Sequence, residues 1–179
     1  GNSFDYTAIH GWGLFGNNGY SWVSVSDEVF CHPDFEVSQY SAVDIILGEE
    51  KTTPSLSGDG SAEFKVYTPQ FMHKIRQITD GGGNILISGA YVGTDFAEPK
   101  DSVAAGFAKE ILHFIWRTNH ASRTGNFFAT DYGKPWFDMQ GSFNQSAHPG
   151  FYTVEAPDGI EPAGDGAFTI FRYNENNVS

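Results

Sequence analysis

The sequence predicts an α/β fold in which a mainly parallel sheet is followed by a β-rich C-terminal part. Two short apolar runs with glycine at or near their ends, residues 43–47 and 85–87, are typical of strands buried on both faces. Residues 69–80, which lie between these runs, have apolar side chains at helical spacing. Because strands joined through a helix pair in parallel by right-handed crossovers, the two runs predict neighbouring parallel strands.

The N-terminal segment combines helix and strand signals. Residues 2–18 carry apolar side chains at helical spacing, although three interior glycines weaken the predicted helix by about 1 kcal/mol each. Residues 20–25 are rich in β-branched and aromatic side chains, which predicts a strand. Ser26 then precedes Asp27 and Glu28, an arrangement typical of an N-cap followed by acids in the first turn of a short helix.

The middle of the chain holds a loop and two predicted helices. Residues 55–61 are rich in serine and glycine and predict a loop. Thr68 and Pro69 favour the start of a helix, which the glycines after Asp80 end. Residues 101–116 predict a second, longer helix, because one row of apolar side chains recurs every four residues. This row consists of Val103, Phe107, Ile111 and Ile115.

The last third of the chain changes to short strands and turns. Residues 125–130 and 137–139 predict a β-hairpin, and residues 168–173 alternate as a strand. The segment 155–166 is rich in proline, glycine and acids and predicts a loop.

We therefore expect a single α/β domain over residues 1–179. Residues 1–116 form its parallel part and residues 117–179 its part rich in β-hairpins. Because three parallel strands are few for a complete sheet, a further strand or two is expected outside the given chain.

Composition restricts the partners. Asp and Glu number 22 against 10 Lys and Arg, a net charge of −12, which disfavours nucleic acid and acidic polysaccharides. No window approaches 18 consecutive apolar residues, so no membrane insertion is expected. With Cys31 as its one cysteine, the chain has no internal disulfide.

No cofactor and no metal centre are expected. None of the histidine pairs has the His-x-x-x-His spacing of a zinc site. The glycines at residues 81–83 precede a strand and lack the lysine of a phosphate-binding loop.

Candidate site residues follow from the predicted sheet, because ligands of open parallel sheets bind outside the carboxyl ends of the strands. The predicted exits, residues 24–27, 48–53 and 88–95, are all polar. The catalytic candidates at or beside these exits are Glu49, Glu50, Ser88 and His10. The ligand-binding candidates are Tyr91, Thr94, Asp95 and Thr52.

The chemistry of these candidates stays open. Glu49 or Glu50 can act as a general acid or base, or bind a hard cation together with Asp95. Alternatively both are solvated loop acids, because adjacent residues of an extended chain point to opposite sides. The turn after the strand resembles a nucleophile elbow in shape, but its apex falls on Ala90, which leaves Ser88 as the only hydroxyl at the strand end.

Aromatic residues make up 16% of the chain, with 16 Phe, 8 Tyr and 4 Trp. In a chain of this size some of them must be partly exposed, and sugar rings stack on exposed aromatic side chains. The alternative is that phenylalanine is the ordinary core residue of this protein.

A family resemblance rests on residues 1–6, 9–11, 46–53, 82–95, 121–125 and 168–177. Together these segments resemble the exported bacterial proteins usually labelled xanthan-lyase-like. The resemblance implies a flavodoxin-like, three-layer or amidotransferase-like α/β domain in a larger exported protein, often with a carbohydrate-binding module. The nucleophile position of amidotransferase-like domains carries no cysteine in this chain.

These observations lead to one main functional expectation and two alternatives. The main one is a secreted, periplasmic or cell-surface domain that binds a glycan or serves as a non-catalytic scaffold beside further domains of the same polypeptide. The first alternative is a hydrolase or lyase that acts on polysaccharide or cell-wall glycan through carboxylates at the strand ends. The second is an assembly domain without a ligand, so enzymatic activity is left open.

Overall fold

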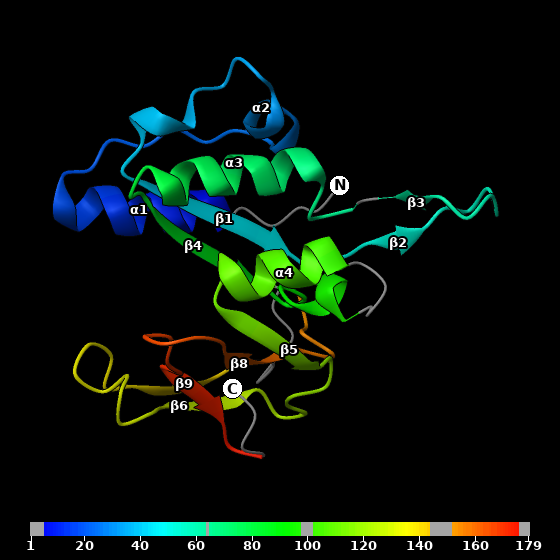
Figure 1. Cartoon of the computed structure of the whole chain (residues 1–179). Coiled ribbons are helices and arrows are strands. Elements are labelled where there is room, and N and C mark those ends of the chain that lie inside the picture. Colours follow the sequence, from blue (N-terminus) through cyan, green and yellow to red (C-terminus); the bar gives the residue numbers. More distant parts are fainter. Residues whose placement is uncertain (1–5, 64, 98–101, 144–151, 176–179) are drawn as a thin grey trace.

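The computed structural model describes residues 6–63, 65–97, 102–143 and 152–175, with the side chains of residues 14–18 and 102 left aside. It confirms the α/β class, since the chain forms both helices and strands (Figure 1). The helices are α1 (Tyr6–Asn18), α2 (Asp27–Cys31), η1 (Val37–Gln39), α3 (Pro69–Asp80), η2 (Thr94–Phe96) and α4 (Ser102–Glu110). The strands are β1 (Ala42–Gly48), β2 (Thr53–Pro54), β3 (Ala62–Glu63), β4 (Asn84–Gly89), β5 (Phe114–Thr118), β6 (Asn126–Ala129), β7 (Gln140–Ser142), β8 (Gly159–Pro162) and β9 (Phe171–Tyr173).

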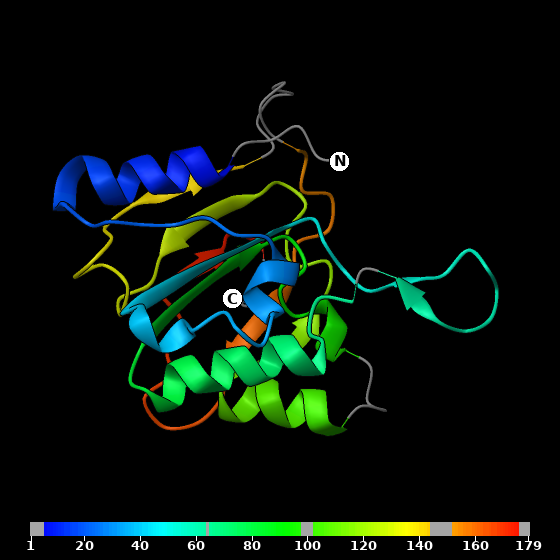
Figure 2. The ribbon, with the colours of Figure 1, turned by 90° about the horizontal axis from the view of Figure 1, so that it is seen from above.

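The centre of the fold is the pair β1 and β4. The two strands are parallel, with Asp44 opposite Leu86 and Ile46 opposite Ser88, which confirms the two predicted parallel strands. The prediction that both faces are buried is wrong for β4, because Leu86 is 59% exposed. Helices lie on both sides of this pair, α1 on one side and α3 with α4 on the other (Figure 2). The parallel part is nevertheless narrower than predicted, because the other strand pairings within the described ranges are antiparallel.

The main core fills the side of β1 and β4 that faces α3 and α4. Alternate side chains of both strands, among them Ile45 and Ile87, pack against this core. Its centre is aromatic: Tyr67 and Phe107 are fully buried, and the Tyr67 and Phe96 rings lie 4.3 Å apart between centroids. Much of the aromatic content therefore fills the core.

The predicted start of α3 is confirmed. The Thr68 hydroxyl accepts a hydrogen bond from the Phe71 amide at 3.2 Å, and Pro69 occupies the first turn. Ser26 precedes α2 as predicted, but its side chain makes no capping hydrogen bond. The predicted loop at residues 55–61 joins β2 to β3.

The predicted strand at residues 20–25 is wrong. These residues are exposed and belong to neither a strand nor a helix, because no neighbouring strand offers them hydrogen bonds. The N-terminal helix is confirmed as α1, while residues 2–5 of the prediction lie outside the described residues.

The predicted helix over residues 101–116 is too long. Asp101 lies outside the described residues, and α4 ends at Glu110. His113 then adopts φ 56°, a left-handed conformation that no α-helix accommodates. The residues after it form β5, because Phe114, Ile115 and Trp116 pair with β8.

The C-terminal part is antiparallel, as predicted, but its strands are shifted. β6 pairs with both β7 and β9, so the hairpin partner is residues 140–142 rather than 137–139. The predicted loop at residues 155–166 contains β8, whose pairing with β5 joins the C-terminal part to the α/β part.

Candidate functional site

The two parallel strands end beside each other, as the candidate site requires. Gly48 pairs with Gly89, and the Ala90 amide donates a hydrogen bond of 2.8 Å to the Gly48 carbonyl. A Cβ atom on Gly89 would lie only 2.9 Å from that of Leu47, so the two exit loops meet where Gly89 has no side chain. Residues of the loops after β1 and β4 can therefore contribute to the same site.

The charges of Glu49 and Glu50 interact with different neighbouring groups. Burial, and after it the charge of Glu49, raises the pKa of the Tyr91 phenol. Burial, and after it the charges of Asp27, Asp95 and Glu28, raises the pKa of Glu50. The two adjacent carboxylates therefore act on different groups, Glu49 on the Tyr91 phenol and Glu50 on the neighbouring acids.

Glu50 and the three acids that raise its pKa, Asp27, Glu28 and Asp95, form an acidic cluster. The effect of this cluster on stability can be tested at Glu50. Its pKa is raised in the folded protein, so its stabilising contribution is present below its ordinary pKa and is lost as the pH rises through the raised value. We expect Glu50→Gln to increase the free energy of unfolding at pH 7 by roughly a few tenths of a kcal/mol, since solvent screens charges at this exposed position. At pH 4, where the folded state holds the proton, the gain should disappear.

Urea unfolding at the two pH values measures this difference. Glu36→Gln is the matched control, because it removes the same charge from the net −12 at an exposed position outside the cluster. Equal gains in both variants would mean that only the net charge matters.

Thr52 and Asp95 bind each other. The Thr52 amide donates to one Asp95 carboxylate oxygen at 3.0 Å, and its hydroxyl donates to the other at 2.6 Å. Both predicted ligand-binding residues therefore hold the two exit loops together.

The Thr94 hydroxyl is hydrogen-bonded to Asp158, an acid that sequence analysis did not select. Asp158, from the segment before β8, accepts hydrogen bonds of 2.7 Å from the Gly93 amide and from the Thr94 hydroxyl. Burial raises the pKa of Asp158, while these two bonds and the nearby Trp116 indole lower it, and burial has the larger effect. The Trp116 N–H itself is buried without a hydrogen bond to a described residue.

We expect Asp158→Ala to lower the free energy of unfolding by about 1–3 kcal/mol, because the Gly93 amide and the Thr94 hydroxyl would lose their acceptor in a part-buried position. Chemical denaturation measures this loss. Asp165→Ala, which removes an exposed acid from the loop after β8, should change stability by less than about 0.5 kcal/mol. Equal losses of unfolding free energy in the two variants would show that the hydrogen bonds accepted by Asp158 do not stabilise the fold.

His10 and Ser88 do come together. They line a cavity of about 320 Å³ between α1, the exits of β1 and β4, and the C-terminal part. The His10 Nδ1 atom lies 2.5 Å from the Asp44 carboxylate, and the second Asp44 oxygen is buried without a hydrogen bond to a described residue. The other lining residues are Tyr6, Ile46, Gly48, Gly89, Ala90, Phe143, Tyr152, Val154, Pro157 and Tyr173.

Two tyrosines at this edge of the sheet are held in their protonated form. Burial, followed by Tyr6 and Glu49, raises the pKa of Tyr152 to about 12. Tyr91 lies under the ammonium group of Lys51, which is 4.3 Å from the ring centroid. Tyr91 thus contacts other protein groups, and the cavity wall is formed by Tyr6, Tyr152 and Tyr173 instead.

A second candidate site lies on the C-terminal part, away from the strand exits. Three exposed rings stack there: Phe168 lies 5.4 Å from Tyr132 and 5.7 Å from Trp136, with interplanar angles of 23° and 15°. Tyr132, Trp136 and Phe168 are 67%, 61% and 43% exposed. We call these three residues the aromatic platform.

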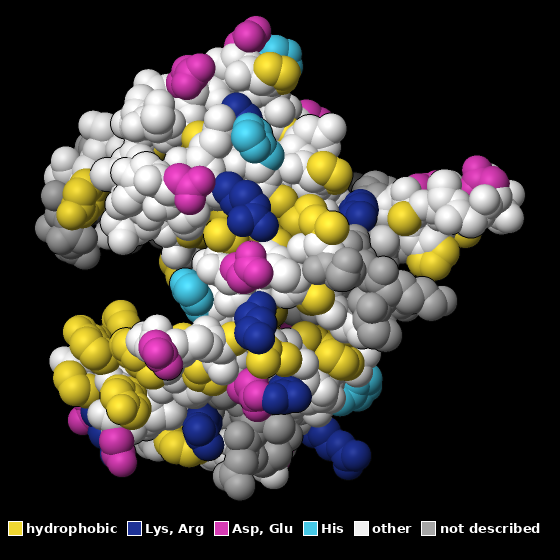
Figure 3. Space-filling model, viewed as in Figure 1, with side chains coloured by type: hydrophobic (Ala, Val, Ile, Leu, Met, Phe, Trp, Pro, Cys, Tyr) yellow, Lys and Arg dark blue, Asp and Glu magenta, His cyan; other side chains and the backbone are white. Residues whose placement is uncertain are grey.

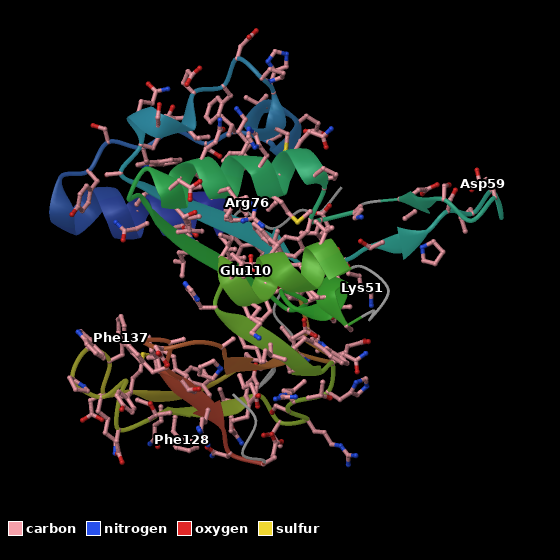
Figure 4. All side chains as sticks on the ribbon, in the orientation of Figure 1. Lys51, Asp59, Arg76, Glu110, Phe128 and Phe137 are labelled. Atoms are coloured by element: carbon pink, nitrogen blue, oxygen red, sulfur yellow. The ribbon has the colours of Figure 1, made fainter. Side chains whose placement is uncertain are left out.

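The aromatic platform belongs to a larger exposed hydrophobic surface over the C-terminal part (Figure 3). Phe128 and Phe137 lie in this part, whereas Lys51 lies across the molecule beside β2 (Figure 4). A depression of about 780 Å³ adjoins Tyr132 and Phe168. Its polar lining residues include Thr130, Asp131, Lys134 and Arg172.

The loop that carries the platform is held by hydrogen bonds. The Thr130 hydroxyl donates to the Thr169 carbonyl at 2.6 Å and accepts from the Gly133 amide at 3.1 Å. A Cβ atom on Gly133 would lie 2.3 Å from the Ile170 carbonyl oxygen, so only glycine fits at this crossing. The backbone that carries the rings is therefore held in place before any ligand binds.

No family model, curated protein or solved structure matches this chain. Within the described residues, no group of three or more His, Cys, Asp or Glu side chains is arranged to hold a metal ion. Among the same residues, no helix is both long and apolar enough to cross a membrane.

Proposed function

We propose that this protein is a glycan-binding α/β domain and that the aromatic platform is its sugar-binding surface. The observation that carries the proposal is the near-parallel stacking of three exposed rings on a backbone held by hydrogen bonds. Exposed aromatic surface is costly in water, and contiguous patches of it mark interaction sites.

The chemistry beside the rings favours a sugar over an apolar partner. One face of a pyranose ring presents C–H groups that stack on aromatic rings, while its edge carries hydroxyl groups that need donors and acceptors. Asp131, Lys134 and Arg172 supply both kinds of group in the adjoining depression. The Lys134 ammonium, 2.9 Å from Asp131, lowers the pKa of that carboxyl, which keeps it an ionised acceptor at neutral pH.

A neutral glycan is the expected ligand. The net charge of −12 repels acidic polysaccharides, and the Lys134 charge is already paired with Asp131. Acidic chains should therefore bind more weakly than neutral ones of equal length.

The finer identity of the domain is part of this proposal. Helices on both sides of the parallel β1–β4 pair support a flavodoxin-like three-layer arrangement. The resemblance to exported xanthan-lyase-like proteins supports a secreted, periplasmic or cell-surface location beside further domains of the same polypeptide. A sugar-binding surface is consistent with such a location.

A second candidate function, a hydrolase or lyase with an acidic residue at the strand exits, is favoured by one observation. The pKa of Glu50 is raised by burial and by neighbouring carboxylates, which is the condition for a general acid. Against it, the Asp95 carboxylate is bound by Thr52, and the charge of Glu49 acts on the Tyr91 phenol. A carboxylate pair around one scissile bond is therefore less well supported than sugar binding.

Isothermal titration calorimetry tests the proposal. The ligands are neutral hexasaccharides of β-1,4-linked glucose, xylose and mannose, with oligogalacturonate as the acidic comparison. We expect at least one neutral hexasaccharide to bind and the acidic one to bind more weakly. A glycan array that stays silent for neutral and acidic glycans alike would contradict the proposal.

A further inference from the structure

His10, which is bound to Asp44, lines one cavity together with Ser88, and none of the described residues that line this cavity belongs to the aromatic platform. Asp44 and Ser88 project to the same face of the β1–β4 pair, because Ile46 pairs with Ser88 and side chains alternate along a strand. Asp44 lies opposite Leu86, two residues before Ser88 on the neighbouring strand. Neighbouring strands are about 4.8 Å apart and two residues along a strand span about 6.6 Å, so the backbones of Asp44 and Ser88 are about 8 Å apart. In a catalytic triad, an imidazole accepts a hydrogen bond from the serine on one nitrogen while a carboxylate holds the other.

The imidazole comes from the helix that covers this face. His10 on α1 places Nδ1 2.5 Å from Asp44, which leaves Nε2 for another partner. His10 and Ser88 both line the cavity. A carboxylate-bound imidazole and a serine hydroxyl that line the same concave site are the groups by which a general base activates a nucleophile.

We propose that Ser88, His10 and Asp44 form a hydrolytic site for esters of small acyl groups. The cavity of about 320 Å³ admits a short acyl chain, and its walls at Ile46, Val154 and Pro157 are apolar. Tyr6, Tyr152 and Tyr173 line the same cavity, and their phenols are the candidates to stabilise a developing oxyanion. The high pKa of Tyr152, about 12, keeps its phenol a hydrogen-bond donor at neutral pH.

The reaction balances without a metal ion or cofactor. The Ser88 Oγ atom attacks the acyl carbon, and its proton passes to His10 Nε2, while Asp44 orients the imidazole and stabilises its cationic form. The alcohol leaves with that proton and an acyl-Ser88 ester remains. Water then attacks this ester with His10 as the base, which releases the carboxylic acid and restores the serine.

A fluorophosphonate reagent tests the nucleophile directly, because it phosphonylates activated serines and leaves ordinary ones unmodified. We expect stoichiometric labelling of the full chain at Ser88, located by peptide mass spectrometry, and turnover of p-nitrophenyl acetate. Ser88→Ala should abolish both. His10→Asn should slow labelling and hydrolysis by about 100-fold or more, and Asp44→Asn by at least about tenfold.

Matched controls separate this site from general reactivity. Ser24→Ala and His32→Asn change exposed residues outside the cavity, and His32 also lies near an aspartate, 3.8 Å from Asp34. Both controls should behave as the unchanged protein, and circular dichroism should show that every variant is folded. Absence of label on Ser88, or equal labelling after His10→Asn in a folded protein, would overturn the site. The ester contains no sugar, so this outcome would leave the glycan-binding proposal standing.

Discussion

Phe107→Ala is expected to lower the free energy of unfolding by about 3–5 kcal/mol. Phe107 is 0% exposed and lies at the contact between α4 and the aromatic core, with its ring 6.3 Å from that of Tyr67 and 6.4 Å from that of Phe96. Its removal would leave a cavity that rigid neighbouring rings cannot fill. A loss of this size is a large part of the total stability of a typical domain.

Urea denaturation with an unchanged m-value measures the loss. Val103→Ala is the matched control, since Val103 lies one turn earlier on α4 and is 68% exposed. This control should change stability by less than about 0.5 kcal/mol. A small effect of Phe107→Ala would mean that α4 does not pack on the core as described.

Trp136→Ala is expected to weaken binding of a neutral hexasaccharide by about 10- to 100-fold, or roughly 1.4–2.8 kcal/mol. Trp136 is the largest ring of the aromatic platform and an end of the stack, so its outer face is open to a sugar. The variant should keep the stability of the unchanged protein, because the side chain is mostly exposed.

Calorimetry with the hexasaccharide that binds best measures the change in Kd. Trp12→Ala is the control, since Trp12 is an exposed tryptophan of α1 outside the platform. It should leave Kd unchanged. Equal affinity for Trp136→Ala and the unchanged protein would remove the platform from the binding site.

Sequence patterns correctly predicted the elements that are signalled by a few adjacent residues. The strands around residues 45 and 86 were evident because each is a short apolar run next to a glycine. The start of α3 was evident because Thr68 and Pro69 satisfy its first turn. Such signals depend on a few adjacent residues, which is why they can be recognised without the rest of the chain.

The errors arise where distant residues decide the conformation. Residues 20–25 have strand-forming side chains but no partner strand. Residues 114–116 continue a helical pattern, yet pairing with β8 draws them into β5. Periodicity alone cannot decide whether residues 114–116 form a helix or a strand, because their partner strand β8 lies more than 40 residues away along the chain.

The candidate sites show the same limit. His10 and Ser88 were named from the sequence, but Asp44 was taken only as part of a strand, although an acid within a buried apolar run is itself a signal of a polar partner. Asp158 stood among several loop acids without a distinguishing pattern. The aromatic platform joins residues 132, 136 and 168, and composition alone predicted that exposed rings exist without saying which ones.

The most direct test is a two-dimensional NMR titration of the protein with the hexasaccharide that binds best. The chain has four tryptophan indole signals, and Trp136→Ala identifies the one of interest. Binding at the aromatic platform predicts that the Trp136 indole and the amides of Tyr132 and Phe168 shift, while the Trp12 and Trp116 indoles stay in place. Shifts confined to the strand exits, with the Trp136 signal unmoved at saturation, would contradict it.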